Sequence, residues 1–276
     1  MRAAVVQLNS NSDVGSNLER AEALVKAAAG DGAELIVLPE KWALLGPGDV
    51  IAREAEPLDG KIVTAARGWA QDLGVHLCAG SVPEDPADGG KPYNTSVLID
   101  PSGEITATYR KLHMFDVEVE GTVYRESEYE RAGDDLVTAT AGGLELGMTV
   151  CYDLRFPELF RILALRGATA FTVPAAFTAV TGRAHWELLL RARAVENAAF
   201  VIAAGQVGTS EPHYDSWGQS MIVDPWGRIL AQLDDDGEGY ACADLDLAEL
   251  ERVRESLPAL ANRRGDAYEW PVEAKA

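Results

Sequence analysis

Apolar residues in the first part of the chain recur at two spacings, which predict alternating strands and helices. Short apolar runs at residues 3–8, 35–38 and 75–79 predict strands, because a strand buried on both faces carries apolar side chains at successive positions. Apolar residues three or four positions apart predict helices at residues 18–30 and 64–73. This order of strand, helix and strand is typical of βαβ units.

The first predicted helix also carries signals for its two ends. Ser16-Asn17-Leu18-Glu19 has the Ser-x-x-Glu form of a capping box, in which two side chains satisfy free backbone N–H groups at a helix start. Gly30 is a residue typical of a helix end. We therefore expect this helix to begin near Ser16 and to end at Gly30.

The second part of the chain repeats the same alternation. Apolar runs predict strands at residues 146–150, 170–173 and 200–204, and helical spacing predicts helices at residues 157–166 and 185–198. We therefore expect two halves of similar construction.

A weak internal repeat supports this expectation. Residues 96–105 and 220–229 each contain a strand pattern, a tight Asp-Pro-x-Gly turn and a second strand pattern, which predicts one hairpin in each half. Residues 75–81 and 200–206 repeat at nearly the same offset. Two such halves can form one α/β domain with two sheets between layers of helices. The alternative is two unrelated hairpins that use the same turn chemistry.

Charge and composition limit the classes of partner. The chain has 276 residues, with 24 Lys and Arg against 44 Asp and Glu, and its net charge is −20. Such a charge repels phosphate backbones and anionic lipid, so we expect neither nucleic acid nor a membrane as a partner. The longest uncharged stretch, residues 167–182, is shorter than the about 20 apolar residues of a membrane span. A few local arginines can still bind an anionic substrate.

The three cysteines are too few for a disulfide framework. They indicate reduced thiols and a cytoplasmic protein, and the N-terminal residues become polar too soon for the core of a signal peptide. Cys78 and Cys242 lie within apolar strand patterns, so we expect both in the core.

Cys151 has a different context. It follows the apolar run 146–150 and precedes a helix with Pro157 near its first turn. This position predicts a thiol at the carboxyl end of a buried strand, where α/β proteins place reactive groups. Backbone N–H groups in such a turn can stabilise an oxyanion. The alternative is a small buried cysteine that fills the core.

Glu40 and Lys111 are two further candidates for chemistry. Glu40 directly follows the apolar run 35–38, where loss of hydration makes a carboxylate a better proton acceptor and suits it to general-base work. The alternative for Glu40 is a solvated or helix-capping acid. Lys111 lies just past the first hairpin, where a fixed ammonium could stabilise an anionic tetrahedral intermediate. The alternative for Lys111 is a surface lysine.

The sequence does not predict a metal site. There are four histidines, and neither a His-x-x-x-His nor a Cys-x-x-Cys spacing occurs. We therefore expect structural roles for His113 and His185.

Three segments, taken in order, resemble the nitrilase superfamily of carbon–nitrogen hydrolases. They are Leu-Pro-Glu at 38–40, Tyr-Arg-Lys-Leu-His at 109–113 and Gly-Met-Thr-Val-Cys-Tyr-Asp-Leu-Arg-Phe-Pro-Glu at 147–158. The resemblance covers the chain from residue 3 to about residue 246. It implies a four-layer α-β-β-α sandwich of two pseudo-repeated halves.

The resemblance also implies a catalytic set of Glu40, Lys111 and Cys151. The thiol of Cys151 would form a thioester, and Glu40 would carry protons between the thiol, the departing ammonia and water. Lys111 and the backbone N–H of Tyr152 would hold the oxyanion. A second glutamate often supports such sites; the best match is Glu126, and three nearby residues compete with it, namely Glu118, Glu120 and Glu128.

Within the superfamily, the chain most resembles the Nit amidases, especially the group acting on deaminated glutathione. The matching stretches are residues 125–127, 176–187, 190–196 and 223–227. Related sequences commonly have Pro where this chain has Arg183, and an extra cation there could alter the mouth of a pocket.

Four residues are expected to bind the substrate, namely Tyr152, Arg155, Phe177 and Thr181. Arg155 is a candidate clamp for a substrate carboxylate, because a guanidinium fork matches that geometry. The alternative for Arg155 is an ion pair with Asp153 or Glu158. Phe177 and Thr181 are expected to line the pocket.

The resemblance implies hydrolysis of the terminal amide of a small ω-amido acid, with release of a carboxylate and ammonia and without a metal or organic cofactor. The alternatives are an N-carbamoyl amino acid or a nitrile as the substrate, or a catalytically silent scaffold on the same fold. We expect a single domain at residues 1–262, a tail at residues 263–276, and a homodimer or higher homo-oligomer.

Overall fold

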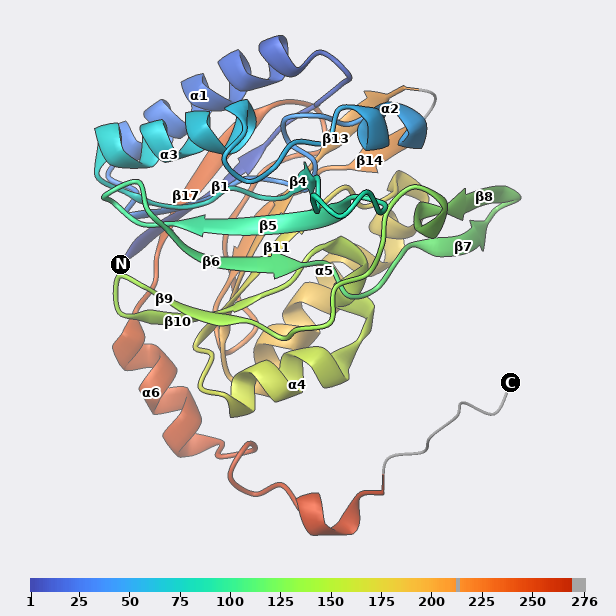
Figure 1. Cartoon of the computed structure of the whole chain (residues 1–276). Coiled ribbons are helices and arrows are strands. Elements are labelled where there is room, and N and C mark those ends of the chain that lie inside the picture. The colour runs from blue at the N-terminus through green and yellow to red at the C-terminus, as the bar shows by residue number, and fades with distance from the viewer. Residues whose placement is uncertain (212–213, 270–276) are drawn as a thin grey trace.

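Two β-sheets lie face to face in the computed structural model, which describes residues 1–211 and 214–269 (Figure 1). One sheet has seven strands in the order β17-β1-β2-β3-β5-β4, with β6 paired to β5. The other has six strands in the order β16-β15-β12-β11-β10-β9. The strands of the first sheet are β1 (Arg2–Gln7), β2 (Leu35–Val37), β3 (His76–Cys78), β4 (Val82–Glu84), β5 (Tyr93–Ile99), β6 (Ile105–Arg110) and β17 (Gly239–Asp244). Those of the second are β9 (Thr138–Ala141), β10 (Leu144–Met148), β11 (Ala170–Ala175), β12 (Phe200–Gly205), β15 (Met221–Val223) and β16 (Ile229–Gln232).

Helices cover the outer face of each sheet. In Figure 1, α1 and α3 lie above the sheets and α4 lies below them. Helix α5 packs against β12 of the second sheet and against α4. The predicted α-β-β-α layering is confirmed. The helices are α1 (Val14–Gly30), α2 (Gly48–Arg53), α3 (Lys61–Leu73), α4 (Pro157–Leu165), α5 (Ala179–Asn197) and α6 (Leu247–Ser256). Three short 3₁₀ helices are η1 (Glu126–Glu128), η2 (Cys151–Arg155) and η3 (Gly265–Ala267).

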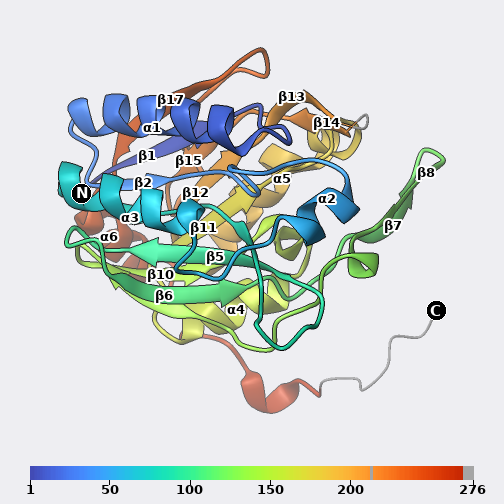
Figure 2. The ribbon, with the colours of Figure 1, turned by 45° about the horizontal axis from the view of Figure 1, so that its top comes forward.

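Two small hairpins extend the sandwich at one end. They are β7 (Asp116–Val119) with β8 (Thr122–Arg125), and β13 (Val207–Ser210) with β14 (Tyr214–Trp217). Figure 2 shows the β7–β8 hairpin projecting away from the body of the molecule. Neither hairpin is predicted by the sequence pattern.

The two halves of the chain share one topology. β1, β2 and β3 run parallel to one another, as do β10, β11 and β12. An antiparallel strand flanks each set on one side, β17 beside β1 and β9 beside β10. A hairpin closes each set on the other side, β5–β6 beside β3 and β15–β16 beside β12. The predicted pseudo-repeat is therefore present in the fold.

The two repeated hairpins also turn in the same way. Asp100 Oδ1 accepts hydrogen bonds from the backbone N–H groups of Ser102 and Glu104, at 2.9 and 3.1 Å. Asp224 Oδ1 accepts the corresponding bonds from Trp226 and Arg228, at 2.9 and 2.8 Å. The glycines that follow, at positions 103 and 227, have φ of +82° and +86°, which L side chains rarely adopt. The Asp-Pro-x-Gly pattern therefore forms the same turn in both hairpins.

The central strands β1 and β2 of the first sheet are buried on both faces. Val5 and Val37 pack in the cluster between the two sheets, whereas Val6 and Ile36 pack in the cluster beneath α1 and α3. Neighbouring residues of a strand point to opposite faces, so both faces need apolar side chains. This explains the continuous apolar runs in the sequence.

Several predicted boundaries are wrong. Helix α1 ends at Gly30 as predicted, but its N-cap is Asp13, whose side chain accepts from the Ser16 N–H at 3.1 Å. Ser16 is therefore inside the helix, and the predicted capping box does not form. Helix α5 begins at Ala179, because Thr178 caps it and accepts from the Thr181 N–H. The predicted strand 146–150 ends at Met148, since the chain turns there into η2.

The described helices include none that is long and apolar enough to cross a membrane. The predicted division into a domain at residues 1–262 and a tail at residues 263–276 stays a prediction, and residues 270–276 of that tail lie outside the described part of the chain.

Candidate active site

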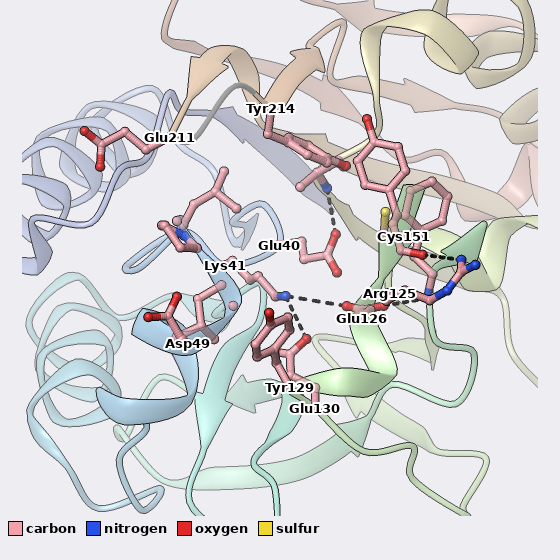
Figure 3. A pocket seen from close by; sticks show the side chains of 18 of the residues that line it. Glu40, Lys41, Asp49, Arg125, Glu126, Tyr129, Glu130, Cys151, Glu211 and Tyr214 are labelled. Atoms are coloured by element: carbon pink, nitrogen blue, oxygen red, sulfur yellow. Dashed lines mark hydrogen bonds and ion pairs between the residues drawn. The ribbon is translucent and has the colours of Figure 1, made fainter. Parts of the chain in front are cut away.

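Three of the predicted site residues meet at one end of the sandwich. Glu40 follows β2, Lys111 follows β6 and Cys151 follows β10. All three line a cavity of about 360 Å³, a size suited to a small ligand. Glu126 lines the same cavity (Figure 3). The structure thus brings together residues that are far apart in the sequence.

Cys151 lies at a sharp turn between β10 and α4. It is the first residue of η2, its φ is +49°, and its side chain is buried. A positive φ is strained for a residue with a β-carbon, so the surrounding structure must hold the turn. Burial raises the pKa of the Cys151 thiol well above its ordinary value, and the Glu40 carboxylate raises it further, while Lys111 opposes this shift. The resting thiol is therefore protonated and needs a base.

The buried Asp153 side chain holds this turn. Its Oδ2 accepts from the Val150 N–H at 2.8 Å and from the Tyr109 hydroxyl at 2.6 Å. Its Oδ1 lies 2.7 Å from His113 Nδ1, and the His113 ring stacks on Phe156. Asp153 therefore ties the segment of Lys111 to the turn of Cys151, and the structural role expected for His113 agrees with these contacts.

Glu40 is buried and is fixed at both carboxylate oxygens. Oε1 accepts from Asn94 Nδ2 at 2.8 Å and from Lys111 Nζ at 3.0 Å. Oε2 accepts from the backbone N–H of Ala176 at 2.8 Å. Ala176 directly follows β11, so Glu40 bridges the two halves of the molecule. The solvated or capping role considered for Glu40 does not agree with this burial.

Lys111 is equally buried and lies between two carboxylates. Its Nζ is 3.0 Å from Glu40 Oε1 and 2.8 Å from each oxygen of Glu126. Burial alone would lower the pKa of Lys111, but Glu126 and Glu40 outweigh it and hold the pKa well above its ordinary value. Lys111 is therefore a fixed ammonium and not a surface lysine.

Among the four glutamates that were candidates to support the site, only Glu126 lines the cavity. It also accepts from the Phe115 N–H at 2.7 Å. Burial would raise its pKa, but Lys111 and Lys41 lower it far below its ordinary value, so Glu126 is ionised. Glu118, Glu120 and Glu128 are exposed on the β7–β8 hairpin and on η1.

A smaller recess adjoins Cys151. It is lined in part by the four predicted substrate-binding residues, Tyr152, Arg155, Phe177 and Thr181. Tyr152 is the second residue of η2, and the first N–H groups of a helix have no partner within it. Such an N–H can donate a hydrogen bond to an oxyanion formed on a substrate beside Cys151.

Arg155 lines the recess beside Cys151. Its guanidinium carbon lies 5.0 Å from the centre of the Phe177 ring, and Nη1 is 3.3 Å from His185 Nδ1. Within the described residues it forms no ion pair with Asp153 or Glu158, because Asp153 is engaged by Tyr109 and His113. The alternative of an intramolecular ion pair for Arg155 is therefore wrong.

Two other sequence expectations differ from the structure. Arg183 lies over Trp217 at 5.8 Å and, as far as the structure describes the chain, lines neither recess. Cys78 is in the core, but Cys242 is only partly buried at its edge. In residues 1–211 and 214–269 there is no group of three or more His, Cys, Asp or Glu side chains placed to hold a metal ion.

Four residues of the site escaped the sequence analysis. Asn94 donates to Glu40, and the Tyr214 hydroxyl donates to the carbonyl of Ala176. Lys41 and Glu130 form a buried ion pair in the wall of the cavity. Lys41 is next to Glu40 in the sequence, and Glu130 is one helical turn after Glu126, but neither spacing by itself indicates a buried pair.

Comparisons with known proteins agree with this geometry. A family model described as carbon-nitrogen hydrolase matches residues 2–255. The omega-amidase NIT2 of Danio rerio is 38% identical, over 97% of this chain and 96% of that protein. The deaminated glutathione amidase of a Synechocystis species is 42% identical, over 95% of this chain and 97% of that protein.

Solved structures show the same similarity. The Caenorhabditis elegans NitFhit protein superposes with a TM-score of 0.89 at 36% identity, over 97% of this chain and 66% of that longer chain. An amidase from Nesterenkonia sp. AN1, in which acrylamide has added to the active-site cysteine, has a TM-score of 0.79 at 28% identity. That match covers 94% of this chain and 98% of the amidase.

Proposed function

Because the chain belongs to the carbon–nitrogen hydrolase family, we propose that it hydrolyses the terminal amide of a small ω-amido acid to a carboxylate and ammonia. Relatives named omega-amidase and deaminated glutathione amidase, similar over nearly their whole length, support this substrate class. The observation that carries the proposal is the buried Cys151 thiol, which lines one cavity with Glu40 and Lys111.

In the first half of the proposed reaction, the Cys151 sulfur attacks the amide carbon while Glu40 takes the thiol proton. A base is required because the pKa of this thiol is well above its ordinary value. The carbonyl oxygen becomes an oxyanion, which Lys111 and the Tyr152 N–H stabilise. Glu40 then gives its proton to the nitrogen, the C–N bond breaks, and ammonia leaves a thioester on Cys151.

In the second half, water attacks the thioester. Glu40 takes a proton from the water, and the same two donors hold the second oxyanion. The C–S bond then breaks, the thiol recovers its proton from Glu40, and the acid is released. One carboxylate therefore serves both halves, which agrees with the hydrogen bonds that fix both of its oxygens.

Arg155 would make the enzyme prefer substrates that carry a carboxylate. Its guanidinium borders the recess beside Cys151, where it can pair with a carboxylate at the far end of the substrate. Phe177 and Thr181 line the same recess. An ω-amido acid carries its amide and its carboxylate at opposite ends, as this arrangement requires.

Ammonia release from a panel of amides, N-carbamoyl amino acids and nitriles tests the proposal. We expect release from an ω-amido acid, and we expect Arg155→Met to raise KM for that acid by about 10-fold or more, since a charged hydrogen-bond partner is lost. Cys151→Ala is the inactive control. Release from carbamoyl compounds or nitriles alone would contradict the substrate class, and full activity of Cys151→Ala would contradict the mechanism.

We also propose a cytoplasmic homodimer. Three unpaired cysteines agree with a reducing compartment. Large apolar side chains are exposed on α4, on α5 and on the adjacent hairpin turn, a pattern that favours self-association; they are Ile162, Leu165, Leu188, Val195 and Trp226. Sedimentation of the same preparation that is used for the assay reports its mass, and a monomer would contradict the dimer.

A further inference from the structure

One buried ion pair in the cavity wall has no role in the hydrolysis described above. Lys41 Nζ lies 2.7 Å from Glu130 Oε2 and 3.5 Å from Glu126 Oε1 (Figure 3). The Lys41 and Glu130 side chains are only 11% and 2% exposed. The pair therefore adjoins Glu126, which in turn contacts Lys111.

The backbone holds this pair in place. Lys41 has a φ of +53°, and its N–H donates to Ser81 Oγ at 3.0 Å. The Glu130 N–H donates to the Glu126 carbonyl at 3.0 Å, so the two glutamates are one turn apart. Because a positive φ is strained for lysine, the conformation at Lys41 is imposed by its surroundings.

The cluster contains more acids than bases. Three carboxyl groups (Glu40, Glu126 and Glu130) are connected with two ammonium groups (Lys41 and Lys111) in a single chain of contacts. A buried uncompensated charge is costly. The cluster is therefore neutral only when one carboxyl group keeps a proton.

Glu130 is the group that keeps it. Burial and the neighbouring Glu126 raise the pKa of Glu130 to about 7, against the opposing effect of Lys41. Its Oε1 is buried and has no hydrogen-bond partner among the residues that the structure describes. A proton shared toward Glu126 satisfies both acids, whereas two bare carboxylates would repel each other.

We propose that Lys41 and Glu130 are positioning residues: with Glu130 protonated, they hold the ionised Glu126 against Lys111 and so fix the ammonium that faces the oxyanion. This inference rests on the proposed function, and it extends it by assigning a pH control to the site. When Glu130 loses its proton, an added negative charge competes for Lys41, and the field at the oxyanion becomes less favourable. The rate of hydrolysis therefore falls as pH rises through about 7.

Few other groups near this cluster change charge in that range. The pKa of Lys41 and that of Lys111 are raised, and the pKa of Cys151 and that of Tyr214 lie well above their ordinary values. The pKa of Tyr124, which lines the cavity from β8, is also raised. The remaining charged side chains that line the cavity are Asp49, Arg125 and Glu211.

The first test compares wild type with Glu130→Gln, which mimics the protonated acid, over a pH range of about 5.5 to 9. We expect the ratio of kcat, wild type over variant, to fall about fivefold through pH 7, because only the wild type gains the extra charge. Glu128→Gln, an exposed neighbour on η1, is the matched control, and its ratio should stay constant. A constant ratio for Glu130→Gln would overturn the proposal.

The second test removes the cation. Lys41→Met leaves Glu126 and Glu130 side by side, so Glu126 takes up a proton and releases Lys111; we expect kcat to fall about 10-fold or more. Lys41→Arg should recover most of that loss, since it keeps the charge. Thermal unfolding checks that both variants are folded. Wild-type kcat in a folded Lys41→Met would overturn the proposal.

A substrate-independent measurement separates this proposal from the proposed function. The rate at which iodoacetamide alkylates Cys151 is followed by intact mass across the same pH range, with Cys151→Ala giving the background from Cys78 and Cys242. Alkylation depends on the same base and the same field, so the wild-type to Glu130→Gln ratio should again fall through pH 7. If no amide is hydrolysed but this ratio falls, the proposed function fails and the positioning role stands; a constant ratio overturns the positioning role itself.

Discussion

The two halves of the molecule share a strand order but contribute different chemistry to the cavity. The amino-terminal half places side chains there, Glu40 after β2 and Lys111 after β6. Directly after β11, the strand that corresponds to β2, the carboxyl-terminal half has Ala176, whose backbone N–H donates to Glu40. That half provides Cys151 after β10, whereas the segment after β1 has the buried Leu8.

This difference shows how a repeated fold can form one asymmetric site. Each half presents the carboxyl ends of its parallel strands at the same end of the sandwich, and the seam between the halves lies there. The Glu40 carboxylate of one half then lines the same cavity as the Cys151 thiol of the other.

The largest expected effect on activity comes from removing the base that the first half contributes. Glu40→Gln removes the base and replaces one acceptor by an amide that faces the donors Asn94, Lys111 and Ala176. We expect kcat for ammonia release to fall by about 10³-fold or more, because general acid–base catalysis and the network are lost together. Glu54→Gln, an exposed glutamate of the same half, is the control. Activity within tenfold of wild type would mean that the second half supplies its own base.

A smaller effect is expected when the cation between the acids is removed. Lys111→Met leaves Glu40 and Glu126 buried without their partner. We expect the free energy of unfolding to fall by about 3–5 kcal/mol, which is the usual result of breaking a buried ion pair. Urea unfolding at neutral pH measures it, with the exposed Lys26→Met as reference. Equal stability of the two variants would show that the buried ion pairs of Lys111 do not stabilise the fold.

The smallest expected effect compares the two halves outside the site, at their equivalent hairpin turns. Asp100→Ala and Asp224→Ala each remove the side chain that caps an equivalent hairpin turn. We expect each to lower the midpoint of thermal unfolding by about 2–4 °C and by similar amounts, because both lose the same turn hydrogen bonds. Calorimetry of the two variants side by side decides this. If only one of the two variants unfolded at a lower temperature, the two turns would share their geometry but would not contribute equally to stability.

The parallel strands and the two Asp-Pro-x-Gly hairpins could be predicted from the sequence, whereas the starts of α1 and α5 could not. A strand buried on both faces has a continuous apolar pattern, and an Asp-Pro-x-Gly turn has its own local hydrogen bonds. A helix start depends on which of several polar residues accepts the first N–H group. Asp13 and Ser16 are both good caps, and in the folded chain it is Asp13 that accepts the Ser16 N–H.

The candidate site could be predicted only in part. Cys151 and Glu40 are indicated by their places after buried strands and Lys111 by its place after a hairpin, whereas Glu126 is indicated only by resemblance to a family. Glu126 could not be separated from its three neighbouring glutamates until the β7–β8 hairpin and η1 were seen to turn the other three outward. The pair of Lys41 and Glu130 gave no signal at all.

By itself, the sequence determined the α/β class, the two-half construction and the identity of the reactive residue types, because these follow from local patterns of burial and turn chemistry. Only the tertiary structure decided which charges are buried together. The pKa of Cys151, Lys111 and Glu130 depends on loss of hydration and on charged neighbours, most of which come from other segments of the chain. Reactivity at this site is therefore a property of packing, since each side chain would have its ordinary acidity in the unfolded chain.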